Sequence, residues 1–135
     1  MNGIILDTCI LIDAEKGRFD LDQWLASESP RATAGIAAIT LSEMLHGAER
    51  ADTTARAQTR RAWIARVTNT TPILDFDEDC ARIHAIIWAT LEKRGVPIGA
   101  HDMLVAATAL CHGMTVATFN VDEFKRVPNL KVITP

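Results

Sequence analysis

The sequence has no apolar segment long enough to cross a membrane. The longest nearly apolar run is Met103–Cys111, and it contains Thr108, whereas a spanning helix needs about 20 consecutive apolar residues. No lysine or arginine precedes Ile4–Leu6, and Asp7 interrupts that short apolar stretch at once. Because a secretory signal needs a basic start and a longer apolar core, we expect a cytoplasmic protein with no membrane partner.

Cysteine is scarce, and the common catalytic signatures are missing. The three cysteines, Cys9, Cys80 and Cys111, are an odd number at wide spacing among apolar residues, which predicts buried thiols in a reducing compartment and no disulfide framework. The sequence contains no serine-hydrolase elbow, no phosphate-binding loop, no glycine-rich dinucleotide loop and no His-Glu-x-x-His zinc motif. Cys9 begins an apolar helix pattern, so we do not expect it to act as a nucleophile.

The composition is that of an ordinary globular protein. Of the 135 residues, 48% are hydrophobic and 23% are charged, and the net charge is −3, which excludes a generally basic nucleic-acid coat. With no repeat, linker or low-complexity tract, we expect one domain over residues 1–135. A chain of this length buries roughly two thirds of its unfolded surface and needs neither a disulfide nor a structural metal to fold.

Short apolar runs alternate with helical patterns along the chain. The runs predict strands at Gly3–Leu6, Ala34–Ile39, Thr115–Thr118, Leu130–Ile133 and, more weakly, Pro72–Phe76. Their lack of strict alternation is typical of strands covered on both faces. The predicted helices are Cys9–Glu15, Leu21–Ser27, Leu41–Arg66 with a break near Gly47 or Asp52, Glu78–Arg94 ending at Gly95, and Asp102–His112 ending at Gly113. This order predicts an α/β fold with a mostly parallel sheet.

Oxygen-bearing side chains follow three of the predicted strands. Asp7 follows the first, Glu43 the second, and Asn120 and Asp122 a later one, and in open α/β sheets the ligand crevice lies beyond these carboxyl ends. Asp102 begins an alanine-rich helix that is expected to pack closely on the sheet and to add a fourth group. Crowded carboxylates raise one another's pKa, so a bound cation best explains such a cluster. Oxygen ligands favour Mg²⁺ or Mn²⁺, which serve phosphodiester cleavage when held beside a phosphate.

Each of these residues also has a purely local interpretation. Asp7 is placed to cap the next helix, and Glu43 is spaced to reach back to the backbone of Thr40 in a capping box. Asp102 is a favourable charge in a first helical turn, and Asn120 suits a turn. The local interpretations account for single residues, but they do not explain why these residues gather at one predicted edge.

One predicted helix is strongly basic. Between residues 50 and 66 the net charge is +4, whereas the rest of the chain carries −7. We expect Arg56, Arg60 and Arg61 to guide a phosphate backbone toward the acidic edge or to contact an acidic segment of a partner, with a solvated helix face as the alternative. Trp63 and Ile64 beside them offer an apolar anchor for either partner.

Four segments stand out in order along the chain: Ile4-Ile-Leu-Asp-Thr8, Ile39-Thr-Leu-Ser-Glu43, Ile98-Gly-Ala-His-Asp-Met-Leu-Val-Ala-Ala-Thr108 and Val116-Ala-Thr-Phe-Asn120 with Asp122-Glu-Phe124. Together these segments resemble the PIN-domain ribonucleases, and most closely the VapC toxins of VapBC toxin–antitoxin modules. The resemblance implies a PIN-like three-layer α/β/α sandwich and a Mg²⁺-dependent endoribonuclease, the toxin of a type II toxin–antitoxin system. It also implies an RNA substrate, a VapB-like antitoxin and a homodimer.

The resemblance maps the acidic metal ligands onto Asp7, Glu43 and Asp102, and the fourth family position onto Asn120. A neutral residue at a position that is often Asp leaves open whether one or two metal ions act, and whether Asp122 compensates. Thr8, Thr118 and Asp122 are expected as secondary contacts.

Two other functions are compatible with carboxylates at strand ends. A receiver-type signalling domain would carry an acidic residue before Asp7 and a lysine after a late strand, whereas Leu6 precedes Asp7 and the first lysine after Thr118 is Lys125. This pattern disfavours a receiver. The second alternative is a catalytically weak PIN-like module that binds RNA or protein, and the neutral Asn120 keeps it open.

Overall fold

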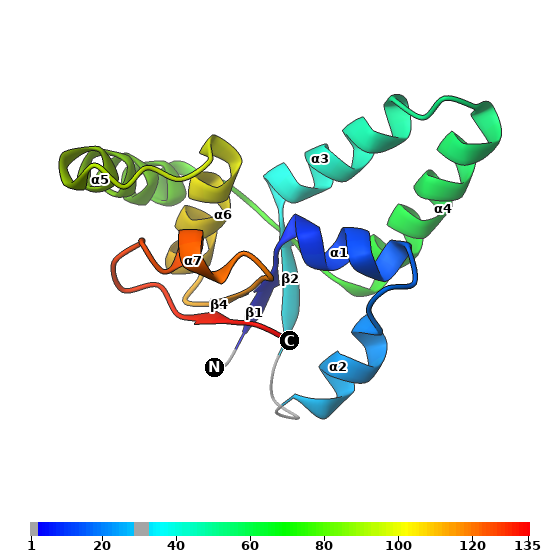
Figure 1. The fold of residues 1–135 in the computed structure, drawn as a ribbon, viewed down its shortest axis with the longest axis horizontal. Helices are drawn as coiled ribbons and strands as arrows, with labels where there is room; N and C mark the ends of the chain where they lie inside the picture. The colour runs from blue at the N-terminus through cyan, green and yellow to red at the C-terminus, as the bar shows by residue number, and fades with distance from the viewer. Residues whose placement is uncertain (1–2, 29–32) are drawn as a thin grey trace.

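The computed structural model describes residues 3–28 and 33–135, and its centre is a five-stranded sheet with helices on both faces (Figure 1). Each neighbouring pair of strands is parallel, and the order across the sheet is β3-β2-β1-β4-β5. The strands are β1 (Ile4–Leu6), β2 (Ala34–Ala37), β3 (Ile73–Leu74), β4 (Thr115–Ala117) and β5 (Val132–Ile133). The predicted parallel α/β/α sandwich is confirmed, and the strand order differs from the 2-1-3-4-5 order of receiver domains.

The two helical layers pack against opposite faces of the sheet. The helices are α1 (Thr8–Glu15), α2 (Leu21–Ser27), α3 (Ala38–Glu49), α4 (Thr54–Thr70), α5 (Glu78–Arg94), α6 (Ala100–Cys111) and α7 (Val121–Phe124). Because side chains alternate along a strand, Ile5 joins a core formed with α5, α6 and α7, whereas Ile4 and Leu6 join a second core formed with α1, α3 and α4.

Helix α6 lies close to the sheet because its inward side is made of small residues. Ala106, Ala107 and Ala109 are completely buried, as the sequence predicted. The helix ends where Gly113 adopts a left-handed conformation with φ of 66°, and Gly95 ends α5 in the same way. Such conformations strain residues that carry a Cβ atom. The packing of α6 fixes the position of Asp102 in its first turn.

Several predicted boundaries were wrong. The second strand ends at Ala37, not Ile39, because α3 begins at Ala38. The last strand is confined to Val132–Ile133, and the short helix α7 was not predicted. The long basic helix is divided near Asp52, as expected, and α4 begins after Thr53, whose hydroxyl accepts a hydrogen bond from the Arg56 amide at 3.1 Å.

The cysteines are less uniform than the sequence suggested. All three are free, as expected, but only Cys80 is fully buried, while Cys9 and Cys111 are half-buried. The expectation of three buried thiols was therefore wrong for two of them. Within residues 3–28 and 33–135, no helix has the length and apolar character needed to span a membrane.

Candidate acidic site

Asp7 stands at the carboxyl end of β1 and is buried, with 5% of its surface exposed. Its carboxylate accepts hydrogen bonds from the Thr8 amide at 2.9 Å, the Thr118 hydroxyl at 2.8 Å and the Cys9 thiol at 3.4 Å. Burial raises the pKa of Asp7 and outweighs these hydrogen bonds, and the nearby Glu43 raises it further. Asp7 does cap α1, as the local interpretation required, but the same carboxylate is also held from β4 across the sheet edge.

Glu43 lies on α3 and faces α1 and α6. It accepts a hydrogen bond from the Thr8 hydroxyl at 2.7 Å, and its other oxygen lies 3.3 Å from Nδ1 of His101. The capping box with Thr40, which was the local interpretation of Glu43, does not form, because α3 begins at Ala38 and Thr40 lies inside the helix. Thr8 is therefore the residue that positions Glu43, and it also contacts the Thr40 hydroxyl at 3.3 Å.

Asp102 and Glu123 lie close enough for their carboxyl groups to titrate together. Burial, the hydrogen bond with Glu123 and the charges of Asp7, Glu123 and Glu43 raise the pKa of Asp102 to about 7. The hydrogen bonds from Asp102 and Asn120 lower the pKa of Glu123. The pair therefore keeps a proton to a higher pH than an isolated carboxyl group does.

Asn120 acts through Glu123 in this geometry. Its side-chain amide donates a hydrogen bond to Glu123 Oε2 at 2.6 Å, and its backbone amide donates to the Thr118 hydroxyl at 2.9 Å. Glu123 was not predicted from the sequence, and Asp122 was considered in its place. Asp122 is exposed, and it is Glu123 that acts on Asp102. The available signal was the spacing Asn120-x-x-Glu123, which is typical of a helix start.

The structure thus brings Asp7, Glu43, Asp102 and Asn120 to one edge of the sheet, together with Thr8, Thr118 and Glu123. The charges of Asp7, Glu43 and Glu123 act on Asp102, so four carboxylates gather at this edge. Among the described residues, no three of these carboxylates place oxygens within 4.8 Å of one another. This spread is expected for like charges that repel.

A basic groove of about 430 Å³ begins at Glu43 and runs between α3 and α4. Arg56 and Arg60 line it, along with His46 and Arg50. The Arg60 guanidinium lies close to the backbone of α3 at Gly47. A Cβ atom at this position would lie only 2.9 Å from the guanidinium, so glycine leaves the space that Arg60 occupies.

The three arginines singled out in the sequence occupy different surroundings. Arg56 pairs with Asp52 at 2.8 Å, and Arg61 pairs with Glu49 at 2.6 Å outside this groove. Both pairs are exposed and contribute little to stability, so either arginine can exchange its partner for a phosphate or an acidic peptide at small cost. Trp63 and Ile64 line a smaller cavity of about 70 Å³ with Glu43 and Arg60, which places the expected apolar anchor beside the acidic site.

Comparison with known proteins identifies the family. The PIN domain model matches residues 4–130. Ribonuclease VapC1 of Rickettsia felis is 38% identical over 98% of this chain and 96% of its own length, and the tRNA(fMet)-specific endonuclease VapC of Salmonella typhimurium is 32% identical over 72% and 71%. The crystal structure of VapBC2 from Rickettsia felis, bound to a DNA fragment from their promoter, contains a chain that superposes with a TM-score of 0.90 at 26% identity, covering 98% of both chains. The chain belongs to the PIN-domain family and, within it, to the VapC ribonucleases.

Proposed function

We propose that this chain is a metal-dependent endoribonuclease that hydrolyses RNA phosphodiester bonds as the toxin of a type II toxin–antitoxin system. The observation that carries the proposal is the gathering of four carboxylates at the carboxyl edge of the sheet in a chain of the VapC group. One relative is named a tRNA(fMet)-specific endonuclease, so transfer RNA is the first substrate class to test. We propose that the protein acts in the cytoplasm, where it would meet its RNA substrate and an antitoxin partner.

The donor set fits a hard divalent cation. Asp7, Glu43 and Asp102 offer only oxygen atoms, which suit Mg²⁺ or Mn²⁺. Burial, the pairing with Glu123 and the charges of neighbouring carboxylates raise the pKa of Asp102, and a bound cation would relieve the repulsion between these charges. Glu123 and Asn120 would complete the site from α7. The carboxylates would have to move together from their present spread to share one ion. When bound, the ion supplies a water of lowered pKa and neutralises charge on the phosphate.

The surrounding residues hold these carboxylates in place. Thr118 is fully buried and joins Asp7 to the backbone of Asn120, so it ties the end of β1 to the start of α7. Thr8 holds Glu43, and Asn120 holds Glu123. Hydrogen bonds of this kind fix the orientation of metal-binding carboxylates, and their removal typically costs about 10–100-fold in metal affinity or activity.

The basic groove and the family membership together point to two binding partners, an RNA substrate and a protein antitoxin. We propose that Arg56 and Arg60 guide the phosphate backbone of RNA toward Glu43, and that a VapB-like antitoxin blocks the same surface. Solved relatives are described as VapBC complexes from Rickettsia felis, Haemophilus influenzae and Salmonella typhimurium, which supports an antitoxin of this class. We also propose that the toxin is a homodimer, as the family resemblance implies.

A cleavage assay on the purified chain tests the proposal. The wild type, Asp7→Asn, Asp102→Asn and the control Asp22→Asn are incubated with transfer RNA and Mg²⁺, with and without EDTA. Asp22 is an exposed carboxylate on α2, so its variant loses one charge outside the acidic site. We expect cleavage only by the wild type and the control, and only with metal. A well-folded wild type that binds RNA and leaves it intact would instead support the binding-module alternative.

A further inference from the structure

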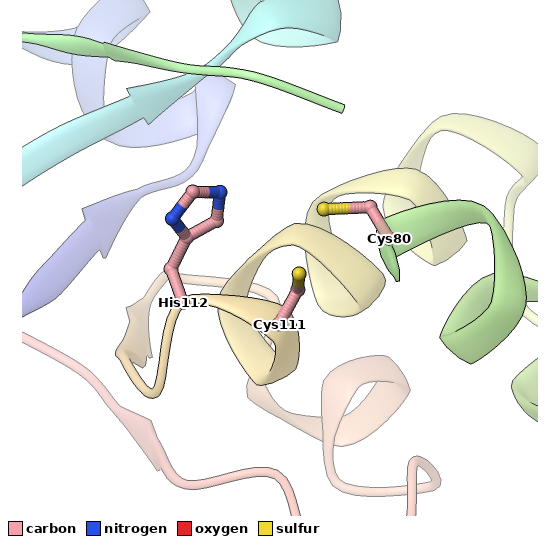
Figure 2. A group of neighbouring side chains, drawn as sticks. All are labelled: Cys80, Cys111 and His112. Atoms are coloured by element: carbon pink, nitrogen blue, oxygen red, sulfur yellow. The ribbon is translucent and has the colours of Figure 1, made fainter. Parts of the chain in front are cut away.

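A second group of metal-ligand side chains lies away from the acidic site. Cys80, Cys111 and His112 each present a donor atom, and these three atoms all lie within 4.8 Å of one another. Figure 2 shows both sulfur atoms and the imidazole ring turned toward one common space. Among the described residues, this is the one group of three ligand-type side chains gathered so closely.

The three side chains are placed by helix ends. Cys80 lies in the first turn of α5, whose start is capped by Asp77 through the Cys80 amide at 3.1 Å. Cys111 is the last residue of α6, and His112 is the residue that caps its end. The site therefore joins the start of α5 to the end of α6, whereas Asp102 stands at the opposite end of α6.

The backbone carbonyl oxygen of Asp75 lies next to this group of side chains. It lies 3.5 Å from the Cys80 sulfur and 3.1 Å from Nε2 of His112. Two side chains from different elements are thus directed at one oxygen atom. Cys80 is fully buried, Cys111 is half-buried and His112 is exposed, so the group has a protein-filled inner side and an outer side through which an ion can enter.

The chemistry of these donors selects a soft or borderline cation. Two sulfurs and one imidazole nitrogen are ligands that Zn²⁺ prefers, and they differ in kind from the oxygen donors that Mg²⁺ prefers. Zinc–sulfur bonds of about 2.3 Å and zinc–nitrogen bonds of about 2.0 Å in a tetrahedron separate the ligand atoms by roughly 3.5 Å. Atoms already within 4.8 Å need to close by at most about 1.5 Å, which is within reach of side-chain rotation.

We propose that Cys80, Cys111 and His112 form a Zn²⁺ site, separate from the acidic site, that links α5 to α6. The fourth position is taken by water or by the Asp75 carbonyl. Each thiol releases its proton to solvent as its sulfur binds the ion, so binding of one ion releases two protons and involves no change in oxidation state. The neutral imidazole binds through a nitrogen lone pair.

Co²⁺ is the probe that reports this site directly, because thiolate-bound Co²⁺ absorbs in the near ultraviolet and carboxylate-bound Co²⁺ does not. The reduced, metal-free chain is titrated with Co²⁺, and we expect a charge-transfer band that saturates at one ion per chain. Zn²⁺ should abolish the band, and Mg²⁺ should leave it. The double variant Asp7→Asn/Asp102→Asn should keep the band, which separates this site from the acidic one.

Two variants at the site and two elsewhere identify the ligands. Cys111→Ser and His112→Gln should lose the band or bind Co²⁺ at least about tenfold more weakly, while Cys9→Ser and His46→Gln, which remove a thiol and an exposed imidazole elsewhere, should bind as the wild type does. Circular dichroism and melting in EDTA show that each variant is folded. As a second measurement, Zn²⁺ should slow alkylation of Cys111 in the wild type.

The proposal is overturned if the folded wild type shows no thiolate band. It is equally overturned if Cys9→Ser abolishes the band, or if Zn²⁺ leaves the alkylation of Cys111 unchanged.

Discussion

Replacing Asp102 by asparagine should make the metal-free protein more stable at neutral and alkaline pH. The pKa of Asp102 is raised from 3.8 to about 7 in the folded protein by burial, by Glu123 and by the neighbouring charges. Between these two values the unfolded chain has lost the proton while the folded chain keeps it. Folding stability therefore falls as the pH rises from about 4 to 7, and above about 7 the full penalty remains. The asparagine side chain of the variant carries no charge, and its amide can donate to Glu123 as the protonated carboxyl does.

The size of the effect follows from the pKa difference. A shift of about 3 units corresponds to about 4 kcal/mol if it is taken in full. Asp102 is only partly buried, and the lowered pKa of Glu123 belongs to the same shared proton, so solvent screening and coupling reduce the penalty. We expect the variant to gain about 1–2 kcal/mol at about pH 8, which raises the melting temperature by roughly 3–8 °C.

Urea unfolding and thermal melting across pH measure this difference in EDTA. The gain should shrink as the pH falls toward about 4, and the control Asp122→Asn, which removes an exposed charge next to the pair, should show no such pH-dependent gain. Adding Mg²⁺ should stabilise the wild type more than the variant. A variant that is less stable than the wild type throughout this pH range would refute the charge-crowding argument, because the Asp102 carboxylate would then make net favourable contacts.

Three further predictions concern the residues around the acidic site. Thr118→Val removes the 2.8 Å hydrogen bond to Asp7 in a fully buried position, and we expect a decrease of about 1–3 kcal/mol in stability by urea unfolding and at least about tenfold slower cleavage, both restored by Thr118→Ser. Arg56→Gln with Arg60→Gln should weaken RNA binding and reduce the slope of log affinity against log salt by about 0.7–0.9 for each phosphate that is no longer neutralised, measured by filter binding. Glu123→Gln should raise the Mg²⁺ concentration needed for half-maximal cleavage, and an unchanged requirement would remove Glu123 from the metal site.

The residues predicted most directly are those that follow a buried apolar run. Asp7 comes at once after Ile4–Leu6, so the strand itself locates it at the carboxyl edge of the sheet. Glu43 was also placed at this edge although the strand boundary was wrong, because α3 starts immediately after β2 and its first turns remain above the edge. A boundary error of two residues therefore changed the local contact of Glu43, from Thr40 to Thr8, without changing which edge it occupies.

The local sequence pattern could not predict contacts between helix ends that are far apart in the sequence. Helix α7 has four residues, which is too short for a helical period to be visible, and the approach of Glu123 to Asp102 depends on how α6 and α7 pack together. The group of Cys80, Cys111 and His112 is hidden for the same reason. Cys80 is about thirty residues from the other two in sequence, and the group comes together only because α5 and α6 run in opposite directions, so that the start of one meets the end of the other.

The two ends of α6 therefore carry donor sets of opposite chemical character. Asp102, at its start, lies near the carboxylates of Asp7, Glu43 and Glu123, which are hard oxygen donors. Cys111, at its end, faces a thiol and an imidazole. Since thiolate and imidazole ligands suit Zn²⁺ and disfavour Mg²⁺, Mg²⁺ should bind only at the start of the helix, whereas the end of the helix should select Zn²⁺. The alanines between them keep α6 packed closely on the sheet, so both donor sets are supported by the same buried core.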